Sequence, residues 1–285
     1  MHVKLIECPR DAMQGIQQFI ETPQKVAYLN QLLRVGFDTL DFGSFVSPKA
    51  IPQMRDTVEV LNSLDLDLVQ TKLLAIVANV RGAENACQFE AIRYIGFPFS
   101  ISETFQQRNT NSSIQDSLKS VEAIQELCVK HHKELVLYIS MGFGNPYGDD
   151  WNADLVAYWV SQMDKMGIRI ISLSDTIGIA NPQSISYIFK ELILRLPHIE
   201  FGAHLHTTPF TWQEKLEAAW EAGCKRYDGA IMGFGGCPMA ADALTGNMAT
   251  ENIVSFLESK SIVSGLNPIE FEKSMQLAKQ VFPMH

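Results

Sequence analysis

The strongest constraint on the fold is an unbroken alternation of short apolar strands with amphipathic helices. Eight strand–helix pairs follow one another through the 285 residues. Strands that alternate with helices predict a parallel sheet, because each helix returns the chain to the starting end of the next strand. Eight pairs in a chain of this length favour an α/β fold of the (β/α)8 TIM-barrel type, whose typical size is about 250 residues.

Helices fill the intervals between the expected strands, among them helices over about 52–63 and 83–93, a long helix capped by Ser113 and a helix opened by Asn181-Pro182. Two additional C-terminal helices are expected near 251–259 and 269–281. The expected strands cover residues 3–8, 37–42, 73–80, 94–100, 135–140, 169–173, 198–204 and 226–232. No Pro-, Gly- or Ser-rich linker divides the chain, so we predict one catalytic domain over 1–285, with closing helices from about 250 to 285. An open doubly wound sheet is the alternative. It would be expected to carry a glycine-rich nucleotide turn after the first strand, and Cys8-Pro9-Arg10-Asp11 is not one.

Charge and cysteine usage exclude several classes of protein. The net charge of -9 and the lack of any Lys/Arg run argue against a nucleic-acid-binding surface. No apolar run is long enough to span a bilayer, and the N-terminal apolar stretch is too short and too charged for a signal peptide. The five cysteines have no framework spacing, which is typical of reduced thiols. We expect a soluble cytoplasmic protein.

Polar side chains follow nearly every expected strand, at the end where barrels of this type carry their catalytic groups. After the first seven strands come Arg10 and Asp11, Asp41, Asn79, Ser102 and Glu103, Ser140, Asp175, and His204 and His206. This convergence on one rim of the barrel predicts an active site there.

The segment His204-Leu-His206 carries the most specific chemistry. On a strand, positions two apart face the same side, so both imidazoles can point into the barrel mouth. Two imidazoles, a carboxylate and an amide oxygen would suit a divalent cation, and Asp11 and Asn247 are available oxygen donors. The alternative is a pair of histidines satisfied by neighbours and solvent. Asp11 on the same predicted rim favours the metal site.

The segment 231–250 combines several glycines with a Cys-Pro pair directly after an apolar run. That composition is costly for a connector, because glycine loses the most conformational freedom on folding. Cys237 is the one cysteine in this glycine-rich loop. Cys87, Cys128 and Cys224 fall in or at the ends of expected helices, where they are expected to pack.

Arg10 and Asp175 each have two interpretations. An Arg-Asp dipeptide is commonly part of a surface ion pair, but its place after the first strand allows Arg10 to hold a carbonyl or carboxylate as charge develops. Asp175 can belong to the site or can cap a helix or turn. The residues themselves leave both alternatives for Asp175 open.

Five segments of the chain form a recognisable set. They are Arg10-Asp11, Thr-Leu-Asp41-Phe-Gly-Ser-Phe-Val-Ser-Pro-Lys49, Ser-Asp175-Thr-Ile-Gly178, His204-Leu-His206, and Gly-Gly-Cys237-Pro with Thr-Gly-Asn247-Met-Ala-Thr-Glu. Taken together, they resemble the hydroxymethylglutaryl-CoA lyase family, within the metal-dependent TIM-barrel lyases and Claisen-type synthases. The resemblance extends over about residues 3–265. Ser-Phe-Val-Ser-Pro-Lys and Gly-Gly-Cys-Pro are specific motifs, whereas Arg-Asp and His-x-His alone are not.

The resemblance implies a retro-Claisen cleavage of 3-hydroxy-3-methylglutaryl-CoA to acetyl-CoA and acetoacetate, with Mg2+ or Mn2+ as the cofactor. An acyl-CoA substrate and a homodimeric assembly are expected with it. By position, the implied metal ligands are Asp11, His204, His206 and Asn247. The implied catalytic groups are Arg10, Asp41, Asp175 and Cys237. The implied substrate contacts are Arg10, Gln14, Asn79 and Ser140.

The resemblance also assigns roles to individual groups. Arg10 would stabilise the enolate oxygen of the departing acetyl thioester. Cys237 would be an acid/base on a mobile loop, and Asp175 would transfer a proton or orient a neighbouring group. A related Claisen-type synthase or aldolase, which condenses acetyl-CoA or pyruvate with a 2-oxo acid, is a second hypothesis. Such synthases usually carry a long carboxyl-terminal extension beyond the barrel. A barrel that binds an acyl-CoA without processing it is the third.

Several positions depart from the family pattern. Asp41 stands where the family usually has Glu, so its side chain is one methylene shorter toward Arg10. Thr207-Thr208-Pro209-Phe210 replaces Asp-Thr-Tyr-Gly, and Val136 replaces an arginine of the fifth strand. The cysteine loop is one residue longer and passes through Asp242. These changes near the acyl pocket are consistent with a different hydroxyacyl group or with weak activity.

Overall fold

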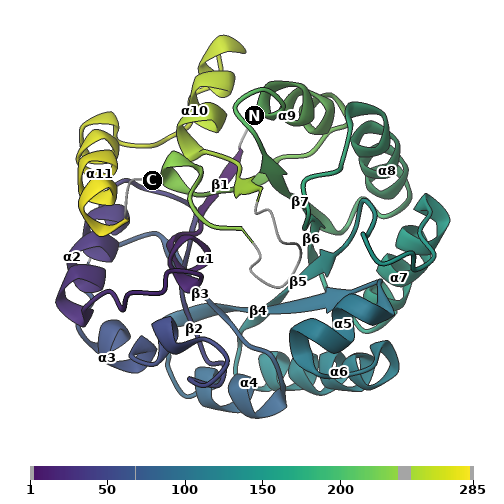
Figure 1. Cartoon of the computed structure of the whole chain (residues 1–285), viewed down its shortest axis with the longest axis horizontal. Coiled ribbons are helices and arrows are strands. Elements are labelled where there is room, and N and C mark those ends of the chain that lie inside the picture. The colour runs from purple at the N-terminus through teal and green to yellow at the C-terminus, as the bar shows by residue number, and fades with distance from the viewer. Residues whose placement is uncertain (1–2, 68, 237–244, 283–285) are drawn as a thin grey trace.

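The computed structural model describes residues 3–67, 69–236 and 245–282, and it confirms the predicted barrel. Parallel strands lie at its centre and helices surround them (Figure 1). The barrel closes because β1 pairs with β8 and β6 with β7. Within the described residues, the eight parallel strands are β1 Lys4–Glu7, β2 Thr39–Ser44, β3 Lys72–Ile76, β4 Ile92–Ser100, β5 Glu134–Ser140, β6 Ile170–Asp175, β7 Glu200–Thr207 and β8 Arg226–Gly229.

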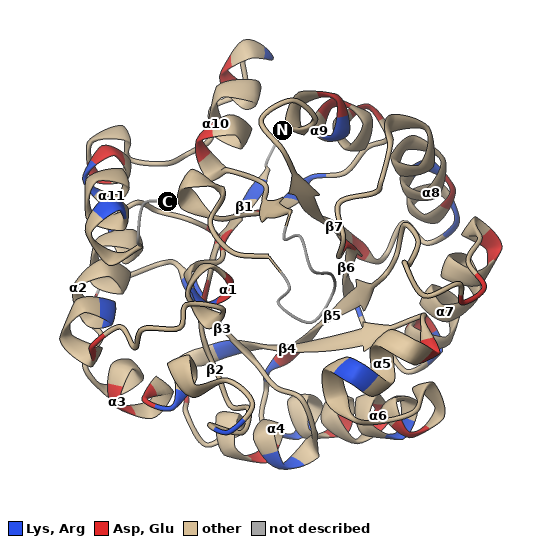
Figure 2. Cartoon of the chain, in the orientation of Figure 1, with Lys and Arg blue, Asp and Glu red and all other residues tan. Residues whose placement is uncertain are grey.

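The helices form the outer ring, and the C-terminal α11 lies beside α2 (Figure 1). Their bounds are α1 Pro9–Gln14, α2 Thr22–Leu33, η1 Pro52–Met54, α3 Thr57–Asn62, α4 Val80–Cys87, α5 Glu103–Thr110, α6 Ile114–Lys130, α7 Ala153–Lys165, α8 Pro182–Arg195, α9 Trp212–Glu221, η2 Ile231–Gly233, α10 Thr250–Ser259 and α11 Pro268–Val281. Charged residues of both signs are spread over this ring (Figure 2). Of the helices described, none is long and apolar enough to cross a membrane.

Side-chain caps begin several of these helices as the sequence predicts. Ser113 accepts a hydrogen bond from the backbone N–H of Asp116 at the start of α6. Asn181 forms a capping box with Ser184 at the start of α8, with Pro182 in the first turn. Such caps satisfy backbone donors that have no partner inside the helix.

Two predicted helix boundaries are wrong. The helix expected over 83–93 begins earlier, at Val80, and ends at Cys87, because the residues from Ile92 onward are almost all buried and join β4. The helix expected over 52–63 is divided into η1 and α3. At this break the hydroxyl of Thr57 donates to the carbonyl of Met54, a local bond that competes with continuous helix.

Two short helices directly follow strands and replace expected loops. At the start of α5, Ser102 caps the helix by accepting from Phe105, and Glu103 accepts from the backbone N–H of Ile114. These two polar residues therefore serve helix ends rather than the barrel mouth. The other short helix is α1, which begins with Pro9 and buries the next two residues, Arg10 and Asp11.

Candidate active site

The carboxylate of Asp11 and the imidazoles of His204 and His206 meet at the mouth of the barrel. Asp11 comes from the first turn of α1, and both histidines come from β7. One ligand atom from each residue lies within 4.8 Å of the others. The two imidazole centroids are 5.4 Å apart, as expected for side chains two positions apart on a strand.

The chemistry of these three residues fits a divalent cation. The Nε2 atom of His206 is buried and has no hydrogen-bond partner among the described residues, and an unpaired buried polar atom is costly unless a ligand or water satisfies it. Burial and the neighbouring His204 lower the pKa of His206 to about 4, so its imidazole is neutral at neutral pH. Burial acts to raise the pKa of Asp11, but Arg10 and the histidines outweigh it and the net shift is downward. A neutral imidazole and a carboxylate are the forms that bind cations.

Asn247 is brought to the same place by a short antiparallel strand, β9 (Gly246–Asn247), which pairs Asn247 with His206. Its amide nitrogen donates to Asp11 Oδ2 at 2.7 Å and to the carbonyl of Phe234 at 2.9 Å. Its Oδ1 is therefore the atom left for a cation. Gly235 permits this approach: its φ is +95°, and a Cβ there would lie 2.7 Å from the Asn247 amide nitrogen.

Arg10 is held beside the three candidate ligands by two carboxylates and an amide. Its Nη2 is 2.5 Å from Asp41 Oδ2, and its Nε lies 3.1 Å from the same oxygen. Its Nη1 donates to Asp11 Oδ1 and to Gln14 Oε1, each at 2.9 Å. Burial raises the pKa of Asp41 to about 6 against the opposing effect of Arg10. The shorter Asp41 side chain therefore still reaches Arg10.

Asp175 lies at the end of β6, where both of its carboxylate oxygens contact other groups of the protein. Its Oδ2 is 2.7 Å from Nζ of Lys215, and its Oδ1 accepts from the backbone N–H of Ala180 at 3.0 Å. Lys215 also donates to the carbonyls of Gly178 and His206, at 2.8 and 2.9 Å. Burial raises the pKa of Asp175 against the lowering effect of this ion pair. The contacts favour the turn-capping interpretation, with Lys215 tying the end of β6 to the backbone of His206.

The remaining predicted residues fall in different places. Asn79 is exposed, and its Oδ1 accepts from the backbone N–H of Gly82 as the cap of α4. Ser140 is buried at the end of β5, and Val136 lies in an apolar cluster with Tyr138 inside the barrel. Cys237 and the loop residue Asp242 lie outside the described residues.

Two residues with contacts to the site were missed by sequence reasoning. Asp228 on β8 has its Oδ2 3.2 Å from Nδ1 of His204. Lys215 on α9 forms an ion pair with Asp175. A signal existed for Asp228. The charged residues Arg226 and Asp228 are two apart in a buried strand, so both face the barrel interior.

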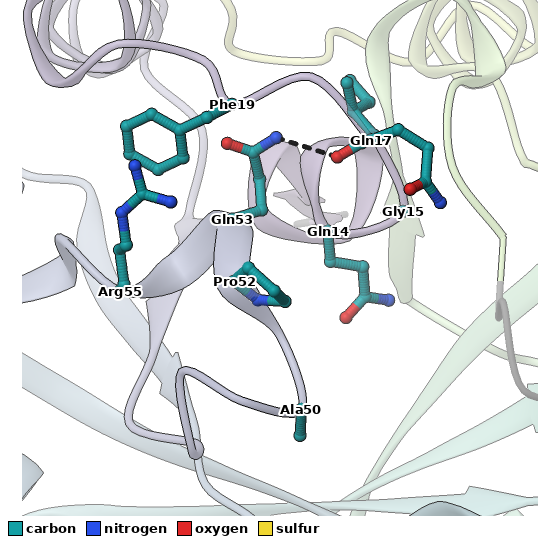
Figure 3. A pocket seen from close by; sticks show the side chains of 9 residues that line it. Gln14, Gly15, Gln17, Phe19, Ala50, Pro52, Gln53 and Arg55 are labelled. Atoms are coloured by element: carbon teal, nitrogen blue, oxygen red, sulfur yellow. Dashed lines mark hydrogen bonds between the residues drawn. The ribbon is translucent and has the colours of Figure 1, made fainter.

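A cavity of about 240 Å3 opens beside Gln14, away from the histidines. It lies between the chain that follows α1 and the η1 region, and Figure 3 shows glutamine side chains around it. The Arg55 guanidinium carbon is 3.4 Å from the centroid of the Phe19 ring. The cavity is lined by Gln14, Gly15, Ile16, Gln17, Phe19, Ala50, Pro52, Gln53 and Arg55.

Comparison with known proteins gives one consistent family. The HMGL-like family model matches residues 3–281. Hydroxymethylglutaryl-CoA lyase YngG of Bacillus subtilis is 34% identical over 273 residues, which cover 96% of this chain and 89% of that protein. A 3-hydroxy-3-isohexenylglutaryl-CoA/hydroxymethylglutaryl-CoA lyase of Pseudomonas aeruginosa is 32% identical, covering 93% of this chain and 88% of its own length.

Solved structures agree with these sequence comparisons. The crystal structure of hydroxymethylglutaryl-CoA lyase from Pseudomonas aeruginosa superposes with a TM-score of 0.91 at 30% identity, covering 100% of this chain and 94% of that one. An HMG-CoA lyase from Acinetobacter baumannii, solved with coenzyme A and 3-methylmalate, gives a TM-score of 0.90 at 28% identity, covering 98% and 91%. With a matching family model over nearly its whole length and relatives above 30% identity, this chain belongs to the HMGL-like family.

Proposed function

We propose that this protein is a divalent-metal-dependent carbon–carbon lyase. Its substrate would be 3-hydroxy-3-methylglutaryl-CoA or a close 3-hydroxyacyl-CoA, and its products acetyl-CoA and acetoacetate. The observation that carries the proposal is the meeting of Asp11, His204 and His206 within 4.8 Å, beside the buried Arg10. The lyase names of the relatives support the same reaction.

Asp11, His204 and His206 would hold the cation, and we add Asn247 Oδ1 as a fourth ligand. Mg2+ or Mn2+ suits this mixed set of nitrogen and oxygen donors. When bound, such a cation supplies Lewis acidity that lowers the pKa of the substrate's tertiary hydroxyl group. The neutral His206 and the ionised Asp11 are already in the protonation states that this requires.

Arg10 would orient the thioester carbonyl and stabilise the negative charge that develops on its oxygen. The side chain is buried, and Asp41 and Gln14 fix its position before substrate arrives. Fixed donors inside a water-poor site are effective because they do not reorganise during the reaction. Burial acts to lower the pKa of Arg10, but Asp41 and Asp11 outweigh it and the net shift is upward, so the guanidinium stays charged.

The reaction requires one proton to leave the hydroxyl group and one to reach carbon. As the bond between C2 and C3 breaks, its electron pair passes into the enolate of acetyl-CoA, and C3 becomes the ketone carbon of acetoacetate. An acid must then protonate C2. We propose Cys237 for this step, on the basis of its motif in the sequence. The ion pair with Lys215 supports a positioning role for Asp175, through the backbone of His206.

The cavity beside Gln14 supports a place for part of the coenzyme A arm. Gln14 contacts both Arg10 and Asp11, so a group in this cavity lies next to the proposed reaction centre. Amide side chains and the exposed guanidinium of Arg55 suit the amides and phosphates of that arm. The homodimeric assembly of the protein stays a prediction.

Turnover of purified protein with Mg2+ tests the proposed function. We expect equal amounts of acetyl-CoA and acetoacetate from 3-hydroxy-3-methylglutaryl-CoA, and loss of both products in His206→Ala. A panel of thioesters with longer 3-alkyl groups would identify the preferred acyl chain. Metal-loaded protein that cleaves none of them would contradict the proposal. Calorimetric binding without product would then indicate a binding protein, and condensation of acetyl-CoA with a 2-oxo acid would indicate a synthase.

A further inference from the structure

Asp228 lies inside the barrel directly behind one of the candidate metal ligands. It is 2% exposed, and the strand register places it opposite His204 across the β7–β8 pair. Its Oδ2 is 3.2 Å from Nδ1 of His204 and 3.5 Å from the hydroxyl of Ser172. The imidazole therefore has one nitrogen facing a buried carboxylate, and Nε2 is the nitrogen left for a ligand.

The other oxygen of Asp228 has no hydrogen-bond partner among the described residues, and neither do polar atoms of two other buried barrel residues. Among the described residues, Asp228 Oδ1, Tyr138 Oη, and Nε and Nη2 of Arg226 are buried without a hydrogen-bond partner. The Tyr138 ring packs edge-on against His204, with centroids 5.7 Å apart. Arg226 lies two positions before Asp228 on the buried strand β8, so the two side chains leave the same face of that strand. Burial acts to lower the pKa of Arg226, but Asp228, Tyr138 and Glu200 outweigh it and the net shift is upward.

The backbone makes room for this arrangement. A Cβ at Gly202 would lie 2.4 Å from the Ser172 hydroxyl and 3.0 Å from Cδ of Arg226. Glycine at this position of β7 therefore leaves the space that the Arg226 side chain occupies. The Nη1 atom of Arg226 is fixed at 3.1 Å from Glu200 Oε1. Its two free nitrogen atoms and the free Asp228 oxygen form a polar, enclosed set that a buried water can satisfy.

We propose that Asp228 is the positioning residue for His204, and that Arg226 holds Asp228 through bridging water. By accepting a hydrogen bond from Nδ1–H, Asp228 fixes the tautomer of His204 and leaves the Nε2 lone pair available to the cation. A carboxylate behind a metal-binding histidine commonly sets ring orientation and ligand basicity in this way. The inference rests on the metal site of the proposed function, and it adds a residue that touches neither cation nor substrate.

Two variants separate this role from general packing. Asp228→Asn keeps the size of the side chain but can donate to Nδ1, which would shift the proton of His204 to Nε2. Its Mn2+ affinity, measured by calorimetry, should fall about 10- to 100-fold. Ser172→Ala removes the other contact of the same oxygen, and its Mn2+ affinity should be unchanged. Wild-type affinity in Asp228→Asn would overturn the proposal, as would an equal loss in Ser172→Ala.

The tautomer itself can be read in the wild-type protein, so the test does not depend on a variant that folds. In 15N-histidine NMR of the Mg2+-loaded protein, assigned with His204→Gln, we expect His204 to carry its proton on Nδ1. A proton on Nε2 would overturn the proposal. In a high-resolution crystal structure, water between Asp228 and Arg226 is expected, and direct contact would contradict the bridge.

These measurements do not require cleavage of a thioester. Protein that binds Mn2+ through an Nδ1-protonated His204 but releases no acetyl-CoA would contradict the proposed function and support the role of Asp228. An Asp228→Asn variant with wild-type turnover and unchanged Mn2+ affinity would contradict the role of Asp228 and leave the proposed function supported.

Discussion

The guanidinium of Arg10 lies against the carboxylate of Asp41, with Nη2 2.5 Å from Oδ2 and Nε 3.2 Å from Oδ1. This contact spans from α1 to β2 and is almost fully buried. The shorter side chain of Asp41, where the resemblance leads one to expect Glu, still reaches the guanidinium. The pair therefore fixes the orientation of Arg10 in this chain.

Removing the charge at position 41 should impair catalysis more than binding. In Asp41→Asn, Arg10 loses its strongest restraint, and we expect kcat for 3-hydroxy-3-methylglutaryl-CoA to fall about 10²-fold, the effect of a small displacement at a reacting centre. Asp41→Glu restores the charge and should retain most of the activity. Steady-state kinetics of the two variants measure this. A wild-type kcat in Asp41→Asn would show that Arg10 does not depend on the pair.

The buried lysine of α9 should contribute strongly to stability. Lys215→Met removes three hydrogen bonds and leaves Asp175 as an uncompensated buried charge. Breaking such a pair lowers the free energy of unfolding by about 3–5 kcal/mol, and urea unfolding of the variant and the wild type measures this difference. Lys119→Met, which loses only an exposed pair with Asp116, is the control and should change the free energy of unfolding far less than Lys215→Met does. A similar cost in both variants would contradict this account of Lys215.

Glu7 should make stability depend on pH. The carboxyl group is fully buried, with Oε1 accepting from Ile231 N–H at 2.8 Å and Oε2 from the Thr250 hydroxyl at 2.5 Å. Burial raises its pKa from 4.5 to about 8. Between these pH values the native state keeps a proton that the unfolded chain has lost. The contribution of Glu7 is thus fully present below pH 4.5 and is lost as pH rises to about 8, by about 1.4 kcal/mol per pH unit.

Glu7→Gln imitates the neutral carboxyl group and should flatten this dependence. The free energy of unfolding, measured from pH 5 to pH 8, is expected to lose the downward slope that Glu7 contributes. Glu122→Gln changes an exposed carboxylate on α6 and should leave the slope as in the wild type. If Glu7→Gln keeps the wild-type slope, Glu7 is not protonated in the folded protein at neutral pH.

Replacing Cys237 should separate proton transfer from metal binding. A serine hydroxyl is a much weaker acid than a thiol, so kcat for Cys237→Ser should fall by about 10²- to 10⁴-fold, the range for loss of a general acid or base. Its Mn2+ affinity should match that of the wild type, since the motif carries no assigned ligand at this position. Full turnover by Cys237→Ser would assign the proton to another group.

The sequence was sufficient for the barrel because its signals are local. Caps such as Ser113 and Asn181 and the alternating strands are readable from neighbouring residues. The short helix α1 could not be predicted in this way, because six residues beginning at Pro9 are too few to show a helical period. In the same way, Asn79 was expected at a strand end but caps α4, since a polar residue after a strand can serve either purpose.

Pairings between distant residues explain what the sequence left open at the site. Lys215 and Asp175 are 40 positions apart, and His204 and Asp228 are 24 apart. Nothing in the local pattern distinguishes an Asp that faces substrate from one that faces a lysine of another helix. Only the barrel geometry brings these groups into contact.

Anomalous scattering from crystals grown with Mn2+ tests the metal centre most directly. We expect one strong peak within coordination distance of the Asp11 carboxylate and of the free ring nitrogens of His204 and His206, and no such peak in crystals of His206→Ala. A Mn2+-saturated crystal without density between these three residues would contradict it.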